Sequence, residues 1–203
     1  MQIRNMKIIG ITGGVGAGKT QVLTYISGKY NCYVILADEV AHKLKEPRQK
    51  CYLELVELLG PDILAENGQI DNGRMAEKIF SSESLLKQVN LIIHPAVKAY
   101  ILSEIERIRS EGQTDFLFIE AALLIEEGYE SIVDELWYIY ASEEVRRKRL
   151  KASRSYSDEK INAILGNQLS EEEYKEHCRV IINNSEDLKN TYMQIDEKLE
   201  EYL

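Results

Sequence analysis

Residues 13–20 read Gly13-Gly14-Val15-Gly16-Ala17-Gly18-Lys19-Thr20 and match the pattern G-x-x-x-x-G-K-[ST] at every specified position. An apolar run, Lys7–Ile11, precedes the match, and a helical segment that stops near Gly28 follows it. In such a loop the glycines let the backbone wrap around a phosphate, towards which successive N–H groups and the helix N-terminus point. The stretch therefore predicts a phosphate-binding loop between a strand and a helix.

The last two residues of this loop indicate the nucleotide chemistry. Lys19 would reach the β- and γ-phosphates of a nucleoside triphosphate, and the Thr20 hydroxyl would hold Mg²⁺. A chance glycine turn before a helix is the competing interpretation, but five specified positions in a strand–loop–helix setting count against it. A dinucleotide-binding turn is excluded, because Lys19 stands where G-x-G-x-x-G requires its last glycine.

The rest of the chain has the pattern of an α/β fold with a parallel sheet. Short apolar runs alternate with segments whose apolar residues recur every three to four positions. The predicted strands are Lys7–Ile11, Tyr33–Ala37, Phe116–Ile119, Leu136–Tyr140 and Val180–Ile182. Core-covering helices are expected over 95–110 and 188–199, with His94-Pro95 opening the first of them. Residues 38–112 contain no convincing strand, which predicts a helical insertion at the sheet edge.

Composition excludes several classes of protein. The 203 residues include 25 Lys and Arg against 34 Asp and Glu, and the net charge of −9 argues against a general nucleic-acid clamp. The three cysteines have no C-x-x-C spacing, so neither a disulfide framework nor a zinc cluster is expected. No signal peptide and no apolar stretch of membrane-spanning length is visible, so we expect a soluble, cytoplasmic protein with no membrane partner.

Three further features are candidates for a catalytic role. Asp38 follows the second strand, where it could serve as a general base or Mg²⁺ ligand, or could simply cap the next helix; the residues alone leave these readings open. Glu120 ends the third strand in the same way. Residues 146–154 carry six basic residues in nine positions, a solvated basic face on their own but a candidate arginine lid beside a phosphate loop. With no N-K-x-D or D-x-x-G stretch, a small-metabolite kinase is favoured over a GTPase.

Taken together, these motifs resemble the dephospho-CoA kinase family along nearly the whole chain. The resemblance lies in the loop, in Leu36-Ala37-Asp38, in Ile93-His94-Pro95, in the Ala122–Gly128 stretch, and in Arg149-Leu150, Gln168 and Val180–Asn183. It implies a three-layer P-loop kinase fold with a helical CoA-binding insertion and a lid. It also implies that ATP, with Mg²⁺, phosphorylates the ribose 3′-hydroxyl of dephospho-CoA, the last step of coenzyme A biosynthesis.

The resemblance also assigns roles to single residues. Asp38 corresponds to the proposed general base, Asn183 to an asparagine near the adenine of ATP, and Arg149 to the lid. His94, Leu123 and Leu124 correspond to the substrate-facing part. The chain departs from the family where Leu36 and Asn72 replace an acid and an arginine, and where Arg154 would substitute for a lid arginine from one position along.

The predicted organisation is one domain over 1–203. Its core covers about 1–38, 113–141 and 178–203, its substrate-binding insertion about 39–112, and its lid about 142–177. The expected ligands are ATP and dephospho-CoA, without nucleic acid, and the expected state is a monomer, an oligomer remaining open. The alternatives are another small-molecule P-loop kinase, for a nucleoside or nucleotide, and a non-catalytic ATP-binding module.

Overall fold

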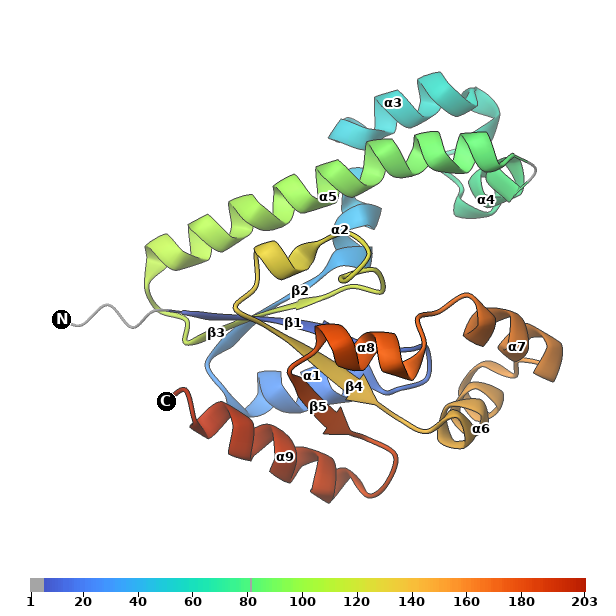
Figure 1. Cartoon of the computed structure of the whole chain (residues 1–203). Coiled ribbons are helices and arrows are strands. Elements are labelled where there is room, and N and C mark those ends of the chain that lie inside the picture. The colour runs from blue at the N-terminus through green and yellow to red at the C-terminus, as the bar shows by residue number, and fades with distance from the viewer. Residues whose placement is uncertain (1–5, 81) are drawn as a thin grey trace. The chain divides into compact units, whose positions relative to one another are not determined.

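A computed structural model describes residues 6–80 and 82–203 of the chain. Five strands form one sheet in the order β2-β3-β1-β4-β5, as Figure 1 shows. Their bounds are Lys7–Thr12 for β1, Cys32–Leu36 for β2, Phe116–Glu120 for β3, Glu135–Tyr140 for β4 and Val180–Asn183 for β5. β1 pairs in parallel with β3 and with β4, and β4 pairs in parallel with β5. The predicted parallel α/β fold is confirmed, and each predicted strand is present within two residues of its expected bounds.

The sheet order brings three chain segments to one edge. In the strand register Thr12 lies beside Tyr138, and Tyr140 lies beside Asn183. The loop after β1, the start of the segment after β4 and the residues after β5 therefore leave the sheet next to one another. Ligands of open α/β sheets bind outside the carboxyl ends of the strands, so this edge is where a site is expected.

The two faces of the sheet are covered by different aromatic contacts, because successive side chains of a strand point to opposite faces. On one face Trp137 packs against Phe118, with ring centroids 6.2 Å apart, and Phe118 packs against Phe116. On the other face Tyr138 stacks on Tyr174 of α8 (Glu171–His177), with centroids 4.6 Å apart. The strands are thus buried on both sides, as parallel strands usually are.

α1 (Lys19–Lys29) and α9 (Leu188–Glu200) pack against each other, as Figure 1 shows. Tyr25 of α1 stacks on Tyr192 of α9 with centroids 3.8 Å apart. Tyr25 and Tyr30 donate their hydroxyl groups to the Asp196 carboxylate at 2.7 Å, and the Lys29 ammonium lies 2.6 Å from it. One carboxylate therefore joins the first helix of the chain to the last.

Three helices connect β4 to β5: α6 (Glu143–Arg154), α7 (Asp158–Gly166) and α8. Ser142, Ser157 and Ser170 cap their N-termini, each accepting a backbone N–H through its side chain. Acidic residues fill the first turn of each helix, which complements the helix dipole. The short helix η2 (Tyr129–Ser131) lies between β3 and β4.

The chain divides into two compact units. We call residues up to 35 together with 108–203 the sheet unit, and residues 36–107 the helical unit. The helical unit contains α2 (Ala37–Leu44), α3 (Lys50–Leu59), η1 (Pro61–Ile63), α4 (Asn72–Phe80) and most of α5 (Glu83–Glu111). Its core includes the fully buried Leu55 and Ile63. The division into core, insertion and lid that the sequence suggests stays a prediction.

Two sequence-based expectations about element boundaries are wrong. Pro95 lies inside α5 rather than in its first turn. Proline cannot donate to the carbonyl of Leu91, but both residues are on the exposed side of the helix, where water can supply the missing donor. The sequence places Asp38 directly after the second strand, but β2 ends at Leu36 and α2 begins at Ala37. Asp38 is therefore a first-turn residue of α2, and the N-cap reading left open for it is not observed.

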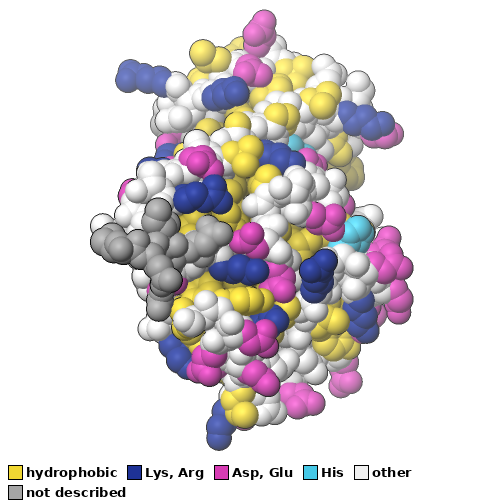
Figure 2. Space-filling model, turned by 60° about the vertical axis from the view of Figure 1, so that its left-hand side comes forward, with side chains coloured by type: hydrophobic (Ala, Val, Ile, Leu, Met, Phe, Trp, Pro, Cys, Tyr) yellow, Lys and Arg dark blue, Asp and Glu magenta, His cyan; other side chains and the backbone are white. Residues whose placement is uncertain are grey.

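Two surface properties bear on what the protein can contact. No helix within 6–80 or 82–203 has both the length and the apolar character that crossing a membrane needs. On the face shown in Figure 2, acidic and basic side chains are interspersed with apolar ones, without a broad area of one sign. The negative net charge is therefore not concentrated on that face.

Candidate active site

The loop after β1 has the backbone that a phosphate-binding loop requires. Gly16 and Gly18 have φ angles of 84° and 93°, in a region that side chains other than glycine rarely adopt. α1 begins at Lys19, so the helix N-terminus with its unsatisfied N–H groups follows the loop directly. This arrangement makes a site for an anionic group.

Lys19 is held over the loop by two oxygen partners. Its Nζ atom donates to the Gly13 carbonyl at 2.7 Å and lies 3.4 Å from Glu120 Oε1. Both side chains of this ion pair are less than one-fifth exposed. Glu120 reaches Lys19 because β3 pairs with β1 and places it opposite Ile11. The sequence leaves the role of Glu120 open, and the structure places its carboxylate beside the loop lysine.

Arg146 of α6 lies against the first half of the loop. Its Nε atom donates to the Val15 carbonyl at 2.9 Å, and its NH2 atom donates to Gln168 Oε1. The same Gln168 oxygen accepts the backbone N–H of Val15 at 3.2 Å. A Cβ atom on Gly14 would lie 2.3 Å from Arg146 NH2, so any other residue there would make the guanidinium shift from its observed position. α6 and the α7–α8 turn are thereby joined to the loop.

Arg149, one turn further along α6, binds the second half of the loop. Its NH1 atom donates to the Ala17 carbonyl at 3.1 Å, and its NH2 atom donates to the Asn184 carbonyl at 2.8 Å. Burial lowers the pKa of the Arg149 guanidinium, although arginine remains charged in proteins. The basic segment thus supplies two cations fixed on loop carbonyl groups.

Asn184, which follows β5, is a fully buried polar residue that ties the loop to the end of the sheet. Its Nδ2 atom donates to the Ala17 carbonyl at 2.7 Å, and its Oδ1 atom accepts the Thr191 hydroxyl of α9 at 3.0 Å. Its backbone N–H donates to the Tyr140 carbonyl at 2.7 Å. A Cβ atom on Gly18 would lie 2.3 Å from Asn184 Nδ2, so this contact also requires a glycine.

The structure separates the sequence-predicted residues of α6 and β5. Arg149 contacts the loop, whereas Arg154 is exposed in the last turn of α6, with its guanidinium 5.9 Å from the centroid of the Tyr156 ring. Asn183 is exposed, and its Oδ1 atom accepts the Ser185 N–H at 2.9 Å. The asparagine that meets the phosphate loop is its neighbour, Asn184.

The residues expected to face substrate fall into both units. In the sheet unit Leu123 is 43% exposed, whereas Leu124 is fully buried with its Cδ1 atom near Gly10, so only Leu123 can touch a ligand. In the helical unit Asp38 is exposed on the first turn of α2, and His94 is half-buried within α5.

Helical periodicity is the signal that would have identified Arg146. At about 100° per residue, Arg146 and Arg149 lie on one face of α6, whereas Arg154 is turned by about 140° from Arg149. Gln168 and Asn184 have no such local signal, because they meet the loop across 153 and 167 positions of sequence. Only the assembled sheet brings them together.

The oxygen groups beside the loop fit a magnesium–nucleotide complex better than a protein-made metal cage. Within the described ranges no group of three or more His, Cys, Asp or Glu side chains is arranged to hold a metal ion. The Thr20 side chain is exposed on the second residue of α1, next to the anion site. Mg²⁺ is commonly held by one or two protein oxygens together with substrate phosphates, and Thr20 fits that use.

Comparison with known proteins identifies the family. The family model described as dephospho-CoA kinase matches residues 7–190. The dephospho-CoA kinase of Streptococcus mutans is 37% identical over 196 residues, covering 95% of this chain and 96% of the relative. That of Carboxydothermus hydrogenoformans is 33% identical over 190 residues, covering 94% and 91%.

Solved structures agree on the fold. The crystal structure of TT1252 from Thermus thermophilus superposes with a TM-score of 0.81 at 28% identity, over 97% of this chain and 98% of that one. Dephospho-CoA kinase from Campylobacter jejuni, at 22% identity and a TM-score of 0.72, covers 96% of each chain and supports the fold. The motifs, the loop geometry and the match over residues 7–190 lead to one conclusion: the chain belongs to the dephospho-CoA kinase family.

Proposed function

We propose that the protein transfers the γ-phosphoryl group of ATP to the ribose 3′-hydroxyl of dephospho-CoA, giving coenzyme A and ADP. The observation that carries the proposal is the phosphate loop with Arg146 and Arg149 fixed on its carbonyl groups, in a member of this family. Phosphoryl transfer needs positioning and positive charge around the β–γ bridge more than it needs covalent chemistry. The loop, Lys19 and the two arginines supply both.

Different parts of the loop bind different groups of ATP. Backbone N–H groups from Val15 to Thr20 and the N-terminus of α1 bind the phosphates. Lys19 exchanges its present contacts with Gly13 and Glu120 for the β- and γ-phosphate oxygens. Thr20 would hold Mg²⁺, which would neutralise charge on the phosphates. Arg149 stabilises the charge that develops on the leaving ADP.

Asp38 acts on the acceptor. As the attacking oxygen of the 3′-hydroxyl forms its bond to the γ-phosphorus, the bond from that phosphorus to the ADP oxygen breaks, and the hydroxyl proton passes to the Asp38 carboxylate. Support comes from the exposed first-turn position of Asp38 in α2 and from the family match. Within the helical unit the Asp38 carboxylate is accessible to a ligand.

The remaining assignments belong to the same proposal. Residues 142–177 form a lid that excludes water during transfer. Residues 39–112, among them His94, bind dephospho-CoA, and Leu123 is assigned to the same substrate. Asn183 lies near the adenine of ATP, and Arg154 contacts ATP from the lid. The enzyme works as a cytoplasmic monomer.

The decisive experiment is an ADP-release assay with dephospho-CoA, nucleosides and nucleoside monophosphates as competing acceptors. Turnover with dephospho-CoA, and a product whose new phosphate is assigned to the 3′ position by ³¹P–¹H NMR, are expected. Preferred turnover with a nucleoside or nucleotide would instead favour another small-molecule kinase. Tight ATP binding without acceptor-dependent ADP release would favour a non-catalytic module.

A further inference from the structure

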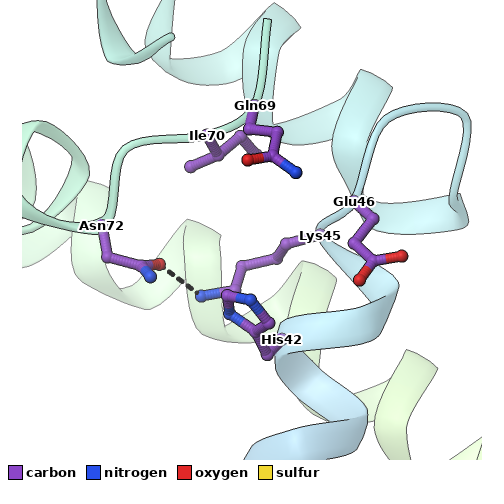
Figure 3. A pocket seen from close by; sticks show the side chains of 6 residues that line it. All are labelled: His42, Lys45, Glu46, Gln69, Ile70 and Asn72. Atoms are coloured by element: carbon purple, nitrogen blue, oxygen red, sulfur yellow. Dashed lines mark hydrogen bonds between the residues drawn. The ribbon is translucent and has the colours of Figure 1, made fainter. Parts of the chain in front are cut away.

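The helical unit has a pocket of its own at the C-terminal end of α2, shown in Figure 3. Side chains of α2, of the turn after it and of the segment entering α4 line it: His42, Lys45, Glu46, Gln69, Ile70 and Asn72. The space of about 290 Å³ among these side chains includes open solvent, so the pocket is an open hollow that a ligand group can enter from outside. All its lining residues lie within 36–107, so the pocket belongs to one unit.

Lys45 is the cation of this pocket. Its Nζ atom donates to Asn72 Oδ1 at 2.9 Å, and in the described parts of the chain no carboxylate lies within ion-pair distance of it. Burial lowers the pKa of the Lys45 ammonium, while the charge of Asp38 acts in the opposite direction. The Lys45 ammonium is partly buried, and one of its three N–H donors is used by the neutral amide of Asn72. Its other donors and its charge can therefore bind an anion.

The other polar groups of the pocket leave room for that anion. Figure 3 shows the Lys45 side chain running towards Asn72, while the Glu46 carboxylate points to the other side. Glu46 is exposed, so water screens its repulsion of an anion at the ammonium.

The pocket is aligned with the proposed base. Asp38 and His42 lie four residues apart on one face of α2, and Lys45, the C-cap residue of that helix, follows His42 after three residues. Seven residues return to within about 20° of the same direction. At 1.5 Å per residue, Asp38 and Lys45 are separated by about 10 Å along the helix.

We propose that Lys45 and its pocket bind the diphosphate of the acceptor whose hydroxyl meets Asp38. The inference rests on the proposed function and names the group of dephospho-CoA that fixes its position. In that molecule one ribose ring and its 5′-methylene separate the 3′-hydroxyl from the diphosphate. A hydroxyl at Asp38 therefore leaves the diphosphate near the far end of α2, within reach of the flexible Lys45 side chain.

The test compares Lys45→Met, Lys45→Arg and Lys43→Met. Lys43 is a matched control, because it lies on the same helix but donates to the Tyr100 hydroxyl at 3.2 Å. Removing a charge-assisted contact with a phosphate should raise the KM for dephospho-CoA about tenfold in Lys45→Met, with the KM for ATP within about twofold of the unmodified protein. Lys45→Arg should keep most of the affinity, and Lys43→Met should change neither KM.

The outcomes separate this inference from the proposed function. If the unmodified protein turns over dephospho-CoA and Lys45→Met keeps its KM, or if Lys43→Met raises it equally, the pocket does not bind the diphosphate. If the unmodified protein gives no turnover, the proposed function fails, and calorimetric titration with inorganic pyrophosphate decides the pocket alone. Because the phosphate loop also binds anions, the number of bound pyrophosphates decides: one fewer in Lys45→Met than in the unmodified protein supports the anion site at Lys45, and the same number in both overturns it.

Discussion

The Asn184 amide donates to the Ala17 carbonyl at 2.7 Å, although 167 positions of sequence separate the two residues. Asn184 is fully buried, and its Oδ1 atom accepts the Thr191 hydroxyl, so both ends of its side chain are used. The phosphate loop is therefore anchored to α9 through one amide. This anchor holds the second half of the loop in the shape that its positive-φ glycines permit.

Asn184→Ala should loosen the ATP site. The Ala17 carbonyl and the Thr191 hydroxyl lose their partner, and leaving such buried groups unpaired costs about 1–3 kcal/mol. We expect the KM for ATP to rise about tenfold while the KM for dephospho-CoA stays within about twofold, since 1.4 kcal/mol corresponds to one factor of ten.

The matched control for this variant is Asn190→Ala, because Asn190 is an exposed residue of α9 whose amide donates to Glu186. It should change neither KM. If Asn184→Ala lowers the melting temperature but leaves the KM for ATP unchanged, Asn184 stabilises the fold without positioning the loop.

Arg146 and Gln168 should behave as a unit. The Gln168 oxygen accepts from both Arg146 NH2 and the Val15 N–H, so removing either side chain breaks the same network. Arg146→Ala and Gln168→Ala should each lower kcat/KM for ATP, by about tenfold. The double variant should be about as impaired as the worse single variant, because coupled residues are not additive.

Gly14→Ala offers a third route to the same defect, since its Cβ atom would displace the Arg146 guanidinium. Arg147→Ala is the control, because Arg147 pairs with Glu143 and Asn162 away from the loop. Additive losses in the Arg146–Gln168 double variant would show that the two side chains act independently.

Asp38→Asn should abolish most turnover while preserving ATP binding. The amide keeps the size and most hydrogen-bonding capacity of the carboxylate but cannot take up the proton of the 3′-hydroxyl. General-base contributions are typically about 10²–10⁴-fold, so a loss of kcat in that range is expected, with an unchanged dissociation constant for ATP. Glu39→Gln, at the next exposed position of α2, serves as the control. Near-normal turnover of Asp38→Asn would rule out the base assignment.

Asp196→Asn should destabilise the packing of α1 against α9 in a pH-dependent way. Burial alone would raise the pKa of Asp196, but hydrogen bonds from Lys29, Tyr30 and Tyr25 bring it below its ordinary value of 3.8. The charged carboxylate therefore stabilises the fold above pH 3.8, and this contribution is lost as pH falls through the lower folded pKa.

Urea unfolding at pH values on both sides of 3.8 tests this expectation. Near neutral pH the variant should lose about 1–2 kcal/mol of unfolding free energy, a modest value because the Lys29 side chain is 45% exposed. The difference should shrink below pH 3.8, and Glu197→Gln, on the exposed side of α9, should show none at either pH. A difference that stays constant down to strongly acidic pH would contradict the role of the charge.

The local sequence patterns predicted which strands and helices form more accurately than they predicted the residues at which these begin and end. The apolar runs gave all five strands, because buried parallel strands are continuous apolar segments. The position of Asp38 relative to the start of α2 and the inclusion of Pro95 within α5 were predicted wrongly. A helix can begin directly after a strand, without a separate cap residue between them. A proline can also lie inside a helix where the carbonyl that loses its N–H donor is exposed to water. Neither boundary therefore has a reliable local signal in the sequence.

By itself the sequence determined the phosphate loop, the parallel α/β architecture and the family, since each depends on residue types at short, fixed spacings. Tertiary structure alone decided that Arg146 and Arg149, rather than Arg154, meet the loop, and that Asn184, rather than Asn183, anchors it. These contacts depend on how α6 and β5 register against β1. That register is set by packing across the whole sheet, and no short stretch of sequence contains it.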